Sequence, residues 1–119
     1  MTAPEITDEQ RHDALIRANK IRTYRAEKKK DVKAGREPFD FLLVRGPHDD
    51  WLRTMKVREA LLSMPGIGKE RVDRMLQRAM VSPSKTLAGM SPQQWERLYR
   101  VLEDYPALRK RLSATGPKV

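Results

Sequence analysis

The chain has 119 residues, with 25 Lys and Arg against 16 Asp and Glu, and a formal net charge of +9 at pH 7. It contains no cysteine, which excludes disulfides, thiol catalysis and cysteine-bound metal. No apolar run approaches the roughly 20 residues of a membrane span, and the amino terminus lacks a basic start and an apolar signal core, so we expect a cytoplasmic protein that is not embedded in a membrane.

The positive charge is segregated along the chain. Residues 1–16 hold four acidic and one basic side chains, whereas residues 17–35 hold eight basic and two acidic ones. Solubility alone does not require this segregation. A polyanionic partner explains it, because each Lys or Arg near a phosphate displaces a condensed counterion.

Strand signals are nearly missing, so the chain is predicted to be all-α. We expect a long basic N-terminal helix or arm in residues 1–36, a compact helical core in residues 37–112, and a frayed tail in residues 113–119. The two histidines, His12 and His48, lie far apart in sequence and are expected to face solvent rather than to bind metal.

The first helix is predicted to begin at Thr7, because Thr7-Asp-Glu-Gln10 is a capping-box pattern, and to run to Gly35. Its apolar stripe is short and consists of Leu15, Ala18 and Ile21. The following basic stretch, residues 22–33, has only weakly apolar residues with which to bury itself. It is therefore expected to be a solvated helix or an arm that orders on binding.

The next segment predicts short elements. A helix of about two turns is expected to start at Pro38 and to end at Gly46-Pro47. A second short element, residues 49–55, is expected to bury Trp51 and Leu52. One helix face then continues the core through Val57, Ala60, Leu61 and Met64.

Two amphipathic helices complete the predicted core. In the first, one apolar face has the spacing i, i+3, i+4, i+7 and i+8, with Arg71, Arg74 and Arg78 on a flank; the face consists of Val72, Met75, Leu76, Ala79 and Met80. The second begins at Ser91-Pro92, with Gln94 completing a capping box. Its apolar face consists of Trp95, Leu98, Tyr99, Leu102 and Tyr105, and a last turn from Pro106 carries Leu108 and Leu112.

The sharpest local feature is Met64-Pro-Gly-Ile-Gly-Lys69. It lies between two helices rather than after a strand, which excludes the dinucleotide fingerprint, and it lacks the length and ending of a P-loop. Gly66 and Gly68 can take positive φ and bring the backbone close to another surface, while Ile67 anchors the hairpin in the core. Free N–H groups at the start of the next helix can then hold a phosphate. The alternative is an ordinary turn between helices.

The order of these features resembles the actinobacterial integration host factors, which are small helix-two-turns-helix proteins of the nucleoid. The resemblance covers roughly residues 5–104 and is carried by Thr7 to Arg11, a basic helix, Met55-Lys-Val57, Leu61-Leu62, Met64 to Lys69, and Pro83 with a closing helix. A more distant likeness links the hairpin to helix-hairpin-helix proteins, to a small-subunit ribosomal protein and to the DNA-binding domain of formamidopyrimidine glycosylases.

The resemblance implies which residues contact DNA. One strand would be held by Pro65, Gly66, Gly68 and Lys69, and the other would touch Ser84, Lys85 and Thr86. Family members carry an arginine-rich run after Pro83, which this chain lacks, so binding is expected to be weaker there or to rely more on Arg74, Arg78 and the basic arm. The arm residues expected to contact DNA are Arg17, Lys20, Arg22, Arg25, Lys28 and Lys29, with Lys30 and Lys33 in the same cluster. The unusual connection at residues 46–51 indicates a divergent copy, of host or phage origin.

We therefore expect a non-enzymatic, monomeric, nucleoid-associated protein without a cofactor that binds double-stranded DNA with little sequence preference and bends or compacts it. A recombinase on the same DNA is a further expected partner. Trp51 and Trp95 are expected in the core rather than stacked on bases, and the acids Asp73, Glu96 and Glu103 lack the partners of a catalytic site. Two alternatives stay open, which are an RNA- or ribosome-binding protein and an adaptor that uses the basic helix against an acidic protein.

Overall fold

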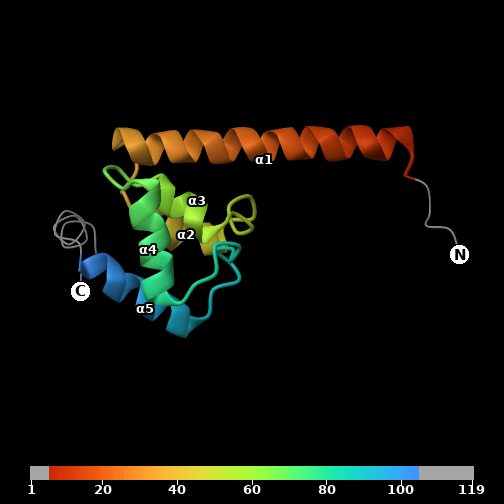
Figure 1. Cartoon of the computed structure of the whole chain (residues 1–119). Helices are drawn as coiled ribbons and strands as arrows, with labels where there is room; N and C mark the ends of the chain where they lie inside the picture. The colour runs from red at the N-terminus through yellow and green to blue at the C-terminus, as the bar shows by residue number, and fades with distance from the viewer. Residues whose placement is uncertain (1–5, 105–119) are drawn as a thin grey trace, which may run out of the picture.

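The structure, a computed structural model, describes residues 6–104. Its helices are α1 (Asp8–Ala34), α2 (Phe41–Arg45), the short 3-10 helix η1 (Gly46–His48), α3 (Val57–Leu62), α4 (Lys69–Ala79) and α5 (Pro92–Glu103). Residues 6–104 form no β-strand, only an isolated antiparallel bridge between Lys56 and Thr86. The predicted all-helical class is confirmed. Helix α1 lies as a long rod along one side of a compact group formed by the other helices (Figure 1).

Both ends of α1 follow local sequence signals. The Thr7 hydroxyl accepts from the backbone N–H of Gln10, and the Gln10 side chain accepts from the N–H of Thr7, which completes the predicted capping box. At the other end Gly35 has φ +79°, and its N–H donates to carbonyls of the last turn. The 27 residues give a rod of about 40 Å.

The part of α1 that packs on the core differs from the prediction. Leu15 is 56% exposed, whereas Val32 in the basic stretch is 1% exposed. The Tyr24 hydroxyl donates to the Asp49 carboxylate at 2.7 Å, and Arg25 donates to the Trp51 carbonyl at 2.7 Å. The expectation that residues 22–33 are solvated was therefore wrong for the face of α1 that carries Tyr24, Arg25 and Val32. The first half of α1 instead extends beyond the core (Figure 1).

The connection between α1 and α3 is less helical than predicted. Helix α2 starts at Phe41 rather than Pro38, because the Pro38 carbonyl first accepts from the Phe41 N–H in a turn. The second short element expected over residues 49–55 consists of turns at residues 50–54. Leu52 is fully buried as expected, but Trp51 is 37% exposed and so does not belong to the core. Its ring meets Tyr24 edge-on at a centroid distance of 5.2 Å, where it contacts α1.

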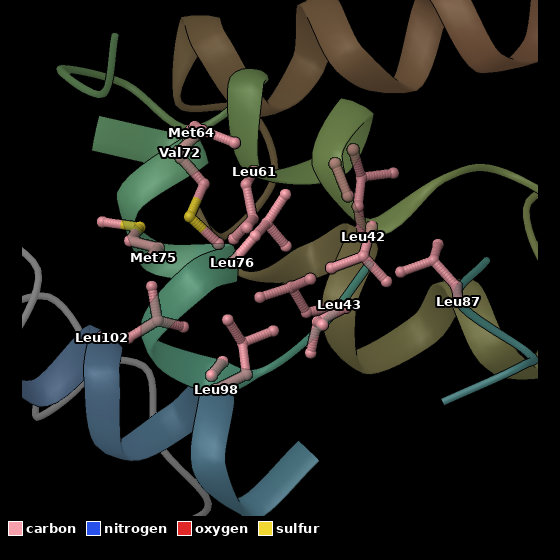
Figure 2. Close-up of a cluster of buried hydrophobic side chains, with 14 of the residues drawn as sticks. Leu42, Leu43, Leu61, Met64, Val72, Met75, Leu76, Leu87, Leu98 and Leu102 are labelled. Carbon is pink, nitrogen blue, oxygen red and sulfur yellow. The ribbon is translucent and has the colours of Figure 1, made fainter. Parts of the chain in front are cut away.

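The core lies between α2, α3, α4 and α5 (Figure 2). The predicted faces of α3 and α4 are buried, with one exception at residue 80, and α5 contributes Leu98 and Leu102. Helix α5 begins with the predicted capping box between Ser91 and Gln94. Trp95 is partly buried against the core, in line with its predicted place. Tyr105, the turn with Leu108 and Leu112, and the predicted tail lie outside the described residues.

Met80 is the exception in the predicted stripe of α4, because it is 72% exposed. Helix α4 ends at Ala79, and Met80 takes φ 58° as a left-handed C-cap whose N–H donates to carbonyls of the last turn. The change of backbone direction removes the side chain from the helical periodicity. Within residues 6–104, no helix is both long and apolar enough to cross a membrane.

We predict that Met80→Gly raises the free energy of unfolding by about 1 kcal/mol, because glycine adopts the left-handed region without the cost that an L side chain meets there. The exposed methionine side chain contributes little packing that could be lost. Urea denaturation of the parent and the variant measures the change. Ala79→Gly, one residue earlier in regular helix, should instead lower stability, and a loss at both positions would contradict the argument.

Candidate nucleic-acid interface

Residues 63–68, here called the hairpin, join α3 to α4. Met64 is 1% exposed and Ile67 is partly buried, so two apolar side chains fix the hairpin to the core. Between them Gly66 takes φ +80°. Gly66 and Gly68 are both exposed, and no atom outside their immediate neighbours lies within 4 Å of where a Cβ would stand. The backbone of the hairpin is therefore open to a large partner.

Gly68 differs from the expectation that both glycines use positive φ. Its backbone is extended, with φ −89° and ψ 168°, and it serves as the N-cap of α4 without a side-chain hydrogen bond. The first N–H groups of α4 have no acceptor within the helix, and a glycine cap supplies none. With the helix dipole behind them, these groups favour an anion.

Positive charge is exposed at the amino-terminal end of α4. Lys69 is exposed and has no ion pair within residues 6–104, and Glu70 approaches Arg74 at 3.8 Å. Asp73 is bound by Arg58 at 2.9 Å, and this hydrogen bond lowers the pKa of the Asp73 carboxyl. The carboxylate is therefore engaged by a neighbouring arginine, which reduces the repulsion that an approaching phosphate would meet.

The two arginines expected as contacts on α4 differ in their surroundings. The Arg74 side chain is 67% exposed, and its only ion pair within residues 6–104 is the long contact with Glu70. The Arg78 guanidinium forms an ion pair with Asp104 after α5. Arg78 thus also joins α4 to α5, whereas the Arg74 charge stays on the surface.

The segment 82–86 lies at the opposite end of α3 from the hairpin. The Val57 N–H donates to the Lys85 carbonyl, and Thr86 forms the isolated bridge with Lys56. Ser84 is exposed, while the Thr86 hydroxyl accepts from the Gly89 N–H at 3.1 Å. The six residues of α3, about 9 Å of helix, separate the segment from the hairpin. The two expected contacts are therefore distinct places on the surface.

The basic residues of α1 divide into two groups. Arg17, Lys20 and Arg22 are exposed and have no ion pair among the described residues. The others have partners inside the molecule. Lys29 contacts Glu59 at 2.8 Å, and Lys28 lies 5.6 Å from the ring centroids of Tyr24 and Phe41. Arg25 binds the Trp51 carbonyl and the Thr54 hydroxyl. Apart from Tyr24, which precedes Lys28 by four residues, these partners are 13 to 30 residues away along the chain, so no local sequence pattern indicated them.

The contacts of α1 also change one acid–base property. The hydrogen bond to the Asp49 carboxylate, together with burial, raises the pKa of Tyr24 to about 12. The Tyr24 hydroxyl is therefore protonated at neutral pH and stays a donor in this contact. His12 and His48 are both exposed, as expected.

Comparison with known proteins gives consistent matches. Residues 32–102 match the family described as the S13-like H2TH domain. The integration host factor of Streptomyces coelicolor is 34% identical over 100 residues, which cover 84% of this chain and 94% of that protein. The integration host factor of Mycobacterium tuberculosis is 33% identical over 94 residues, which cover 79% of this chain and 90% of that protein. A solved structure of sIHF bound to an 8-bp palindromic DNA aligns with a TM-score of 0.64 and 31% identity, covering 71% of this chain and 94% of that one.

The two glycines of the hairpin should differ in what they contribute to stability. We predict that Gly66→Val lowers the free energy of unfolding by about 1–2 kcal/mol or more, because a β-branched residue is strained at φ +80°. Gly68→Val should cost less than about 1 kcal/mol, because extended backbone suits valine and the Cβ meets open space. Urea denaturation compares the two, and equal losses would contradict the assignment.

Proposed function

Since this chain belongs to the integration host factor family and contains an S13-like H2TH domain, we propose that it binds duplex DNA with little sequence preference and bends or compacts it. A similar solved protein is bound to DNA. The observation that carries the proposal is the uncovered backbone of the hairpin, which ends at the uncapped amino terminus of α4. Backbone N–H groups bind phosphate without reading bases, which accounts for low specificity.

The primary contact consists of Pro65, Gly66, Gly68 and Lys69. The glycines allow the DNA backbone to approach the protein backbone, and Lys69 adds a full charge beside the free N–H groups of α4. Arg74 and Arg78 continue the positive surface along α4. This arrangement holds one strand.

A second contact at Ser84, Lys85 and Thr86 touches the other strand. Because this segment lies at the far end of α3 from the hairpin, the duplex is held at two separated points, and such contacts can stabilise a bend. A smooth bend of a short site costs on the order of 1–6 kcal/mol, which the added contacts offset.

The basic helix supplies a third contact. The exposed Arg17, Lys20 and Arg22 are placed for phosphate, since they have no intramolecular ion pair among the described residues. Arg25, Lys28 and Lys29 keep α1 fastened to the core and add positive potential. In this proposal residues 1–36 serve as a basic extension of a DNA-binding core assigned from the sequence to residues 37–112.

The protein acts without catalysis and without a cofactor. Two of the acids considered for catalysis, Asp73 and Glu96, are exposed and form surface ion pairs with Arg58 and Arg100. We also propose that the chain acts as a monomer in the cytoplasm, on the nucleoid, and that a recombinase on the same DNA is a partner. The family of the chain supports the nucleoid location, and a backbone contact without base readout is compatible with a recombinase on the same DNA.

RNA is the second candidate ligand, because the matched domain is described as S13-like and the same hairpin can hold an RNA backbone. Competition between duplex DNA and structured RNA of equal charge distinguishes the two. Preferred retention of RNA would overturn the DNA proposal.

The first test replaces Gly68 with valine, and we predict that DNA binding is lost while the helical fold remains. The valine side chain occupies the space that the DNA backbone needs, although nothing in the protein fills it. A circular-permutation gel shift at two salt concentrations measures binding and bending together, and circular dichroism measures the fold. If Gly68→Val binds as well as the parent, the hairpin is not the contact.

The second test adds charge to the segment after Pro83. We predict that Ser84→Arg strengthens binding and steepens the slope of log affinity against log salt by about 0.9, which corresponds to one more phosphate contact. Ser84 is the suitable position because it is exposed and its hydroxyl bonds to the exposed Ser82 hydroxyl, whereas the partly buried Thr86 would lose the hydrogen bond from the Gly89 backbone N–H. The gain should be equal on two unrelated duplexes. A gain on only one would mean that the segment reads bases.

A further inference from the structure

A groove lies between the carboxyl-terminal half of α1 and α3. Its volume is about 640 Å³, and α3 and the hairpin supply one wall through Glu59, Leu62 and Ser63. Ser63 is the first residue of the hairpin, so the groove leads directly to the hairpin. In Figure 1 the connection between α3 and α4 lies beside the end of α1.

Four cations and one carboxylate line this groove. Lys29 is held by Glu59, and Arg36 is held by Asp31, each at 2.8 Å. The other two cations, Lys30 and Lys33, are exposed and have no ion pair within residues 6–104. The small side chains Ala26 and Ala34 also line the groove, which leaves it open. The available charge is therefore concentrated at Lys30 and Lys33.

We propose that this groove is a phosphate-binding site that receives the DNA backbone where it continues from the hairpin, with Lys30 and Lys33 as the contacts. The inference rests on the proposed function, since the ligand is the same duplex. Lys30 and Lys33 are three residues apart on one helix and rise by about 4.5 Å along its axis. This rise is comparable with the axial spacing of about 3.4 Å between charges on one DNA strand.

The chemistry of the groove favours a DNA backbone over a base. It offers two exposed ammonium groups and no aromatic ring, so it can bind charge but has no platform on which a base could stack. Glu59 is the one carboxylate in its lining and occupies Lys29. Removing the Glu59 charge should therefore release a third lysine to the phosphate.

The experiment compares the parent with Lys30→Gln/Lys33→Gln and with Glu59→Gln, on one duplex between 50 and 200 mM salt. The double variant should make the slope of log affinity against log salt shallower by about 1.8. When the salt concentration rises fourfold, the variant should therefore lose about tenfold less affinity than the parent loses. Glu59→Gln should bind more tightly than the parent and steepen the slope by about 0.9. Circular dichroism monitors the fold of each variant.

Matched variants remove the same charge elsewhere. Arg45→Gln/Arg53→Gln loses two exposed cations outside the groove, and Glu103→Gln loses one exposed carboxylate on α5. Each control variant should change the salt slope by less than half as much as the matched groove variant does. Equal changes in the groove and the control variants would overturn the groove site, because they would reflect net charge alone.

The Gly68→Val variant distinguishes failure of the groove site from failure of the proposed DNA-binding function. If Gly68→Val abolishes binding while Lys30→Gln/Lys33→Gln keeps the parent slope, the groove site is wrong and the proposed function stands. If the parent itself fails to bind duplex DNA, both are wrong. With ¹⁵N-labelled protein and a short duplex, amide shifts at Lys30, Lys33 and Ser63 would support the groove, and their absence during saturating binding would overturn it.

Discussion

Two apolar side chains, the buried Met64 and the partly buried Ile67, hold the hairpin against the core, and the exposed backbone depends on this contact. A glycine hairpin without such anchors would sample many conformations and would lose entropy on meeting a ligand. Here the apolar side chains fix the position of the turn, and Gly66 supplies the one positive φ that the path requires. The core therefore preorganises a surface made of backbone alone.

The basic residues of α1 have two different physical tasks. Arg25 and Lys29 bind acceptors on the turn region and on α3, and Lys28 lies over two aromatic rings. Positive charge thus contributes to the attachment of α1 as well as to the field that attracts DNA. The positive charge of α1 alone therefore does not distinguish the residues that attach the helix from those that are available to DNA.

Features encoded by neighbouring residues could be predicted from the sequence. The capping boxes at Thr7 and Ser91 and the apolar face of α4 need only a few positions in a row. Features that depend on distant partners could not. Trp51 was expected in the core by its apolar character, but the turn that carries it places the ring against Tyr24, 27 residues away along the chain. Met80 fits the helical periodicity, but its left-handed backbone removes it from the face.

The unsupported first half of α1 has a consequence for its dynamics. Residues 8–17 are all exposed, and a free helix of this length would be marginal in water because nucleation is costly. The packed second half supplies the nucleus, so only propagation is needed. The capping box at Thr7 then limits fraying at the free end. Amide hydrogen exchange along α1 should accordingly be graded, fastest at the first turn and slowest near the buried Val32.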